Sequence, residues 1–125
     1  MKEQDFKNPE EAMKALASGE VETAKAASQA TVGLGPNQKG WFTLYWEATA
    51  VGKYDWIGLY ENVNKTDTEY ITGNNWQWAS KGNEYVTNTA CQPGYAARYL
   101  IWDTNTEKYK AIAKTGAYPK KISSK

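Results

Sequence analysis

Residues 54–60 read Tyr-Asp-Trp-Ile-Gly-Leu-Tyr, and this stretch decides the fold. Its aromatic and β-branched residues are typical of a β-strand. Ile57 and Leu59 alternate with Trp56 and Tyr60, so both faces of the expected strand are apolar. A sheet with one solvated face normally shows polar residues on that face. This strand therefore predicts a sheet that is covered on both sides.

Short apolar segments separated by turn residues extend from this strand in both directions. The expected strands cover residues 31–34, 41–50, 54–60, 70–72, 76–78, 84–90, 95–102 and 108–115. Seven or eight short strands with a turn signal after each are typical of a β-sandwich. We therefore expect a mainly β chain that folds into a sandwich of seven or eight antiparallel strands.

Alternation along each strand sorts the aromatic side chains by face. Trp46 and Trp56 are expected in the core of the sandwich. Trp76 and Trp78 share one face of a short strand, so both are expected to point inward, with Gln77 pointing outward. The remaining aromatic residues are candidates for an exposed surface.

The N-terminal part of the chain differs in composition, because Ala, Glu and Lys dominate it and favour helix. Residues 8–11 read Asn-Pro-Glu-Glu, in which Asn8 caps a helix, Pro9 suits its first position and the acids face the positive end of the helix dipole. Residues 20–30 continue the helical composition. We expect a helical arm over residues 1–30, the sandwich over 31–116 and a basic tail over 117–125.

Two alternatives remain for what covers the second apolar face of the sheet. The helical arm carries a thin apolar stripe that includes Met13, Leu16 and Val21, and such a helix needs another surface to be stable. Alternatively, a second copy of the chain packs there, which gives a homodimer through the sheet face at residues 57–59 and 100–102 or through the helix.

Three signatures occur in one order along the chain: Asp-Trp-Ile-Gly-Leu-Tyr at 55–60, Trp-Gln-Trp at 76–78 and Pro-Gly-Tyr-Ala-Ala-Arg-Tyr at 93–99. This pattern resembles the SKICH domains and related fibronectin-type modules of bacterial enzymes. The resemblance covers about residues 31–115 and implies an immunoglobulin-like sandwich. It also implies, as one alternative, a protein–protein interaction module of the SKICH-like type, with the helical arm as the docking element.

Two residues near the third signature have expected structural roles. Pro93-Gly94 followed by Tyr95 suits a tyrosine corner, in which the ring hydroxyl returns to the backbone. Cys91 stands where the family usually has an aliphatic residue, so we expect it to act as a small buried hydrophobic side chain.

The composition excludes several kinds of chemistry. The chain has no histidine and a single cysteine, which rules out Ser-His-Asp and Cys-His sites, an internal disulfide and a zinc knuckle. No calcium-loop spacing is present, so we expect no metal. Without histidine, and with the acids in turns or on solvated strand faces, we expect no catalytic residue, and no cofactor is expected. A glycan-active enzyme that uses Glu47 and Asp103 is the weakest of the alternatives. The net charge of +1 argues against specific nucleic-acid binding.

Apolar runs are short throughout, so no membrane span is expected. The first residues carry charges and lack the apolar core of a secretory signal. The expected location is therefore cytoplasmic, or outside the cell by a route that uses no leader.

Aromatic residues left over after the core is filled lie among short amide and carboxylate side chains. Sugars stack on aromatic rings while their hydroxyl groups bond to amides and carboxylates. We therefore expect a non-enzymatic, lectin-like carbohydrate-binding protein; the same residue types also suit protein recognition. The candidate ligand-binding residues are Trp41, Tyr45, Tyr54, Tyr70, Asn74, Asn75, Trp102, Asp103 and Asn105.

Overall fold

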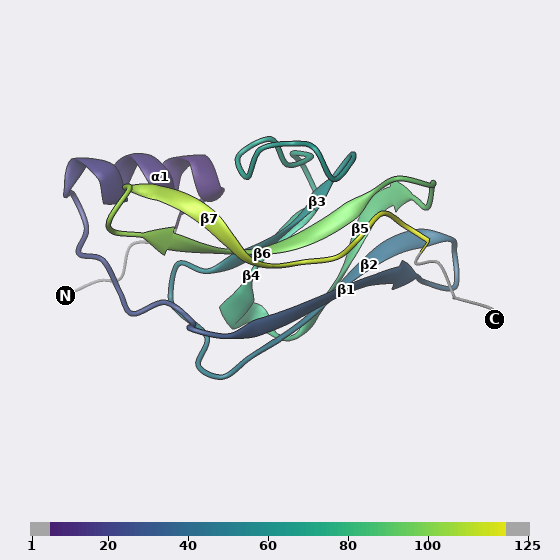
Figure 1. Ribbon diagram of the computed structural model, residues 1–125, viewed down its shortest axis with the longest axis horizontal. Helices are drawn as coiled ribbons and strands as arrows, with labels where there is room; N and C mark the ends of the chain where they lie inside the picture. Colours follow the sequence, from purple (N-terminus) through teal and green to yellow (C-terminus); the bar gives the residue numbers. More distant parts are fainter. Residues whose placement is uncertain (1–5, 120–125) are drawn as a thin grey trace.

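Seven strands form two antiparallel sheets in the computed structural model, which describes residues 6–119 (Figure 1). The three-stranded sheet has the order β1 (Ala30–Pro36), β2 (Trp41–Ala48), β5 (Glu84–Ala90). The four-stranded sheet has the order β4 (Trp76–Trp78), β3 (Trp56–Tyr60), β6 (Ala96–Asp103), β7 (Lys108–Lys114). One α-helix, α1 (Pro9–Ser18), and a 3-10 turn, η1 (Ala79–Lys81), complete the regular structure. The mainly β sandwich is thus confirmed.

Helix α1 begins as predicted and ends earlier. The Asn8 side chain accepts a hydrogen bond from the Glu11 amide at 2.9 Å. Gly19 adopts a left-handed conformation with φ of 82°, which ends the helix, and residues 20–29 run on without helix. The expected helix over residues 20–30 is therefore wrong, because Gly19 ends the helix and the Ala27 amide donates to Asp55 of the sandwich rather than to a helical carbonyl. The expected strand at 70–72 is also absent from the structure.

The core between the sheets is built from the inward faces of β2, β3 and β6. Phe42, Leu44 and Trp46 of β2 meet Ile57 and Leu59 of β3 there. The Trp46 indole N–H donates to the carbonyl of Ala79 at 3.1 Å, so this buried polar atom is satisfied.

A second core lies on the other side of the four-stranded sheet, under α1. Ala12 and Leu16 of the helix pack there against Trp56, Leu100 and Trp102. Figure 1 shows α1 and the loop between β3 and β4 on the same side of this sheet. The four-stranded sheet is therefore covered on both faces, as predicted, and the helical arm supplies part of the second cover. The face that a homodimer through residues 57–59 and 100–102 would use is buried within the chain.

Three tryptophans lie on the opposite side of the sheet from the one expected. Trp56 is buried, but in the core under α1, and Trp76 and Trp78 pack partly exposed against the same core. In the register, Gln77 pairs with Ile57, which faces the core between the sheets. Alternation correctly predicts which residues share a face, but both faces of β3 are apolar and the pattern does not say which one meets the other sheet.

Gly58 is required because the Trp56 ring folds over it. A Cβ at Gly58 would lie 2.6 Å from that ring and 3.3 Å from the Cβ of Tyr70. Both distances are shorter than ordinary van der Waals contact. The Trp-Ile-Gly sequence therefore gives the indole the room to lie flat along its own strand.

Asp55 holds the segment between α1 and β1 against the sandwich. Its Oδ2 atom accepts hydrogen bonds from the Gly52 amide at 2.8 Å, the Ala27 amide at 3.1 Å and the Tyr99 hydroxyl at 2.8 Å. Burial raises the pKa of this carboxyl, and the three hydrogen bonds oppose that effect. One of the two backbone amides that Asp55 binds, that of Ala27, belongs to the N-terminal arm.

Arg98 holds the β3–β4 loop over the outer side of the four-stranded sheet. Its guanidinium donates to the Asp67 carboxylate at 2.8 Å and to the carbonyls of Val63 and Lys65. It also lies 4.2 Å from the centre of the Tyr60 ring. The side chain is only 2% exposed, so these partners replace the water that it loses.

The residues around the third signature pack against the core between the sheets. The Tyr95 ring stacks on Phe42 with ring centres 5.3 Å apart. No hydrogen bond of the Tyr95 hydroxyl occurs within residues 6–119, so the expected tyrosine corner is not formed there. Cys91 is partly buried against the same core, and burial raises the pKa of its thiol. Tyr118 packs edge-on against Phe42, and the rest of the expected basic tail, from residue 120, lies outside the described residues.

Candidate ligand-binding face

The outer side of the three-stranded sheet carries the exposed aromatic residues. Trp41 is 40% exposed and Tyr45 is 42% exposed, and both lie on β2. Their neighbours Phe42 and Leu44 point into the core, which confirms the predicted alternation. The term "open face" refers below to the residues on this side of the sheet: Thr31, Gly33, Gly35, Trp41, Thr43, Tyr45, Glu47, Glu84 and Val86.

Tyr45 lies across two glycines of the neighbouring strand. A Cβ on Gly33 would lie 3.7 Å from the Tyr45 Cβ, and one on Gly35 would lie 3.7 Å from the Tyr45 Cε2. The ring therefore extends along β1 from one glycine to the other. Because the glycines have no side chains, one side of the ring rests on the strand and the other is available to solvent.

Thr43 lies between Trp41 and Tyr45 on β2 and pairs with Gly35 on one side and Val86 on the other. Its hydroxyl is buried and has no hydrogen-bond partner within residues 6–119. Val86 is 44% exposed. The middle of the open face is thus apolar, with one polar atom beneath its surface.

A depression of about 300 Å³ lies beside Tyr45. Polar groups line it from three strands or their ends: Thr31 of β1, Glu47 of β2, and Asn83 and Glu84 at the start of β5. The arrangement places an aromatic ring next to hydrogen-bond donors and acceptors, which is what a polar ligand with apolar patches needs.

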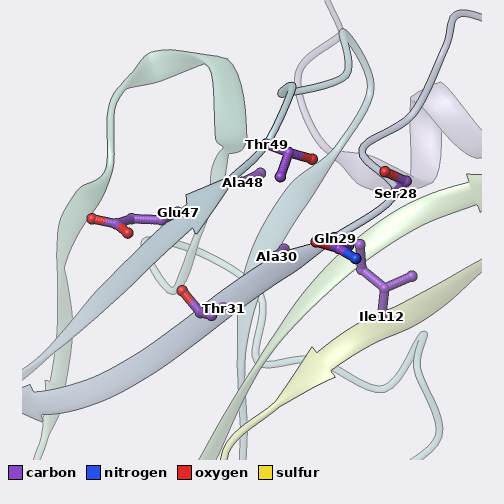
Figure 2. A pocket seen from close by; sticks show the side chains of 8 residues that line it. All are labelled: Ser28, Gln29, Ala30, Thr31, Glu47, Ala48, Thr49 and Ile112. Carbon is purple, nitrogen blue, oxygen red and sulfur yellow. The ribbon is translucent and has the colours of Figure 1, made fainter.

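A second depression of about 520 Å³ begins at the same Thr31 and Glu47. It continues to the ends of β1 and β2 and reaches Ile112 of β7. Figure 2 shows Glu47 and Thr31 toward one end of this depression and Gln29 and Ile112 toward the other. The two depressions share Thr31 and Glu47 in their linings, and together they are called the groove below.

Three of the predicted aromatic ligand-binding residues are buried away from this face. Tyr54, Tyr70 and Trp102 belong to the core under α1, so the expectation that they are exposed is wrong. The Tyr70 hydroxyl donates to Glu10 of the helix at 2.8 Å, and burial raises its pKa. Sequence pattern predicts these rings at the surface because it does not show that α1 and the β3–β4 loop cover them.

The remaining predicted residues serve turns and loops. Asn74 is exposed, whereas Asn75 is buried and donates to the Thr72 carbonyl at 2.8 Å. Asp103 closes the β6–β7 turn, where it accepts hydrogen bonds from the Thr106 hydroxyl and the Asn105 amide, and these bonds lower its pKa. Trp41 and Tyr45 are thus the two predicted residues that the structure brings together on one exposed face.

Sequence reasoning did not place Thr31 and Glu84 beside Tyr45. Thr31, Asn83 and Glu84 line the depression beside the ring because β1 and β5 pair with β2. The one available signal is the Gly-x-Gly spacing at Gly33 and Gly35, which leaves room for a large side chain from the next strand.

No group of three His, Cys, Asp or Glu residues lies close enough together within residues 6–119 to hold a metal ion. No helix in that range is long and apolar enough to cross a membrane. Comparisons with protein families, curated proteins and solved structures found no match to this chain.

Proposed function

We propose that this protein binds carbohydrate, without catalysis, on its open face. The observation that carries the proposal is the Tyr45 ring, which rests on Gly33 and Gly35 and presents its other side to solvent. A flat exposed ring of this kind offers a stacking surface to the C–H face of a sugar. Trp41 offers a second such surface on the same strand.

The polar residues beside Tyr45 complete the chemistry that a sugar requires. Glu47 and Glu84 accept hydrogen bonds from hydroxyl groups, and the Asn83 amide both donates and accepts. None of these roles requires a general acid or base, in keeping with the absence of histidine from the chain. Binding is therefore proposed as the whole activity of this face.

A glycan array with the labelled protein tests the proposal. We expect wild-type protein to bind at least one glycan, and Trp41→Ala and Tyr45→Ala to weaken that binding about fivefold or more, since one stacked aromatic contributes on the order of 1 kcal/mol and excludes water from its neighbours. Val63→Ala is the matched control, because Val63 is also exposed but lies on the β3–β4 loop. Absence of any glycan signal, or equal binding by all variants, contradicts the proposal.

The second candidate is a protein-interaction module of the SKICH-like type. Trp41, Tyr45 and Val86 together make an exposed apolar patch rimmed by polar residues, and Trp and Tyr are frequent at the centre of protein interfaces. The helix is a poor docking element, since Ala12 and Leu16 are already buried against the sheet. Under this candidate, the array stays silent and Trp41→Ala abolishes capture of a partner that Val63→Ala retains.

The proposed relationship to immunoglobulin-like modules is supported by strand order. Numbered along the chain, strands 1-2-5 face strands 4-3-6-7. The constant-type immunoglobulin sandwich places 1-2-5-4 opposite 3-6-7, so this chain differs in the position of its fourth strand. Such sandwiches serve many tasks, and the proposed function therefore rests on the open face alone.

A further inference from the structure

We infer that the groove and the open face take a linear, non-acidic oligosaccharide laid along β2. This inference rests on the proposed carbohydrate binding and adds to it the length and the charge of the ligand. Three observations lead to it: the spacing of the two exposed rings, the lining residues that the two depressions of the groove share, and the charges of that lining.

The spacing of the rings requires a ligand longer than one sugar. Trp41 and Tyr45 are four residues apart on one strand face, which is roughly 14 Å at the rise of a β-strand. One sugar ring covers one aromatic ring, so a ligand that contacts both must contain several sugars in a chain. From Trp41 to Thr49, where the groove continues, the distance is about 27 Å by the same measure.

The groove continues the line of β2 beyond Tyr45. Glu47 lies two residues from Tyr45 and lines both depressions, and Thr49 follows two residues later. Two polar residues that precede β1, Ser28 and Gln29, line this end. Each step along the strand thus offers a new hydrogen-bonding group, which suits a repeating ligand with hydroxyl groups on every unit.

The lining of the groove is acidic and carries no positive charge. Glu47 and Glu84 are the only charged residues among those that line the two depressions in the described part of the chain. Carboxylates accept hydrogen bonds from hydroxyl groups and, more strongly, from ammonium groups. They repel uronates and sulfates, so the expected ligand is a neutral or amine-bearing oligosaccharide.

Isothermal titration with four hexasaccharides and their monosaccharides tests both parts of the inference. The probes are glucose, mannose, glucosamine and glucuronate in monomeric and hexameric form. We expect a hexasaccharide of the neutral or amine-bearing group to bind about tenfold or more tightly than its monomer, and glucuronate hexamer to bind weakest. The Glu47→Gln and Glu84→Gln variants should each improve glucuronate binding about two- to fivefold, the range of an exposed charge pair.

Two variants separate the ends of the groove. Tyr45→Ala should weaken binding of both chain lengths, whereas Gln29→Ala, at the far end, should weaken binding of the hexasaccharide and leave that of the monosaccharide unchanged. Val63→Ala serves again as the control that changes neither. Equal effects of Gln29→Ala at both lengths contradict the lengthwise arrangement.

The outcomes separate this inference from the proposed function. Equal affinity for monomer and hexamer overturns the lengthwise groove and leaves carbohydrate binding standing. Tightest binding of glucuronate hexamer overturns the charge preference alone. Absence of heat with every probe, together with a silent glycan array, overturns the proposed function, and this inference with it.

Discussion

Asp55 lies at the junction of the N-terminal arm and the sandwich. Among the polar side chains at this junction, we expect the loss of its carboxylate to lower the free energy of unfolding the most. Asp55 is 2% exposed, and its Oδ2 atom accepts from two backbone amides and from the Tyr99 hydroxyl. In Asp55→Ala these three buried donors lose their acceptor. Each unsatisfied donor costs about 1–3 kcal/mol, from which the relief of a buried charge must be subtracted, so we expect a net loss of about 3 kcal/mol.

Urea unfolding followed by tryptophan fluorescence measures this loss. With a dependence on urea of about 1–3 kcal/mol per molar for a small domain, the midpoint should fall by about 1 M or more. Tyr99→Phe removes one of the three donors and should cost about 0.5–1.5 kcal/mol. Glu47→Ala, an exposed acid, should change stability by less than about 0.5 kcal/mol. An Asp55→Ala midpoint equal to that of Glu47→Ala refutes the reasoning.

The pH dependence of the same variant gives an independent check. Burial raises the pKa of Asp55 in the folded state, so between its unfolded and folded pKa values the native protein binds more protons than the unfolded chain. The contribution of Asp55 to stability therefore rises as the pH falls through the folded pKa, and levels off below the unfolded pKa of about 3.9. The stability difference between wild type and Asp55→Ala should widen on acidification. If the stability difference between wild type and Asp55→Ala narrows on acidification, folding lowers the pKa of Asp55, and this account is contradicted.

Three further changes probe the second core and the loop over it. Leu16→Ala should cost about 2–5 kcal/mol in urea unfolding because it opens a cavity under the helix, whereas Lys14→Ala on the exposed side should cost little. Gly58→Ala places a methyl group against the Trp56 ring, so we expect a loss of about 1–3 kcal/mol and an altered near-ultraviolet circular dichroism spectrum; an unchanged spectrum argues against the contact. Arg98→Met should cost about 2–4 kcal/mol, less than a fully buried pair because its carboxylate partner is partly exposed, and limited proteolysis should then cut the β3–β4 loop first.

Much of the fold follows from local pattern. Turn residues separate the segments that become the seven strands, and Asn8 and Pro9 begin the helix where capping chemistry requires. The exposure of Trp41 and Tyr45 follows from alternation along β2, because Phe42 and the other residues of the opposite face are apolar. These features depend on neighbours within a few residues, which sequence shows directly.

Features that depend on distant segments were not predictable in the same way. Tyr70 and Trp102 are buried because α1 and the β3–β4 loop cover them, and those contacts join residues far apart in the chain. Alternation also does not show whether Trp56 faces the three-stranded sheet or α1. It sorts the residues of a strand into two faces, but it does not say which face meets the other sheet. The polar partners of Tyr45 depend on strand register, which no local pattern specifies.

The contrast between the two sheets explains why the candidate site lies where it does. The outer side of the four-stranded sheet carries Trp56, Leu100 and Trp102, and the chain covers it with its own helix and loop. The outer side of the three-stranded sheet carries Trp41 and Tyr45 among threonines and glutamates, and no helix or strand within residues 6–119 covers it. Because polar side chains lie among its aromatic rings, this face can remain in contact with water. Complete burial of its carboxylates without hydrogen-bond partners would cost free energy. A ligand that stacks on the rings and hydrogen-bonds to the carboxylates satisfies both kinds of group at once, and for this reason a sugar suits the open face better than another purely apolar surface.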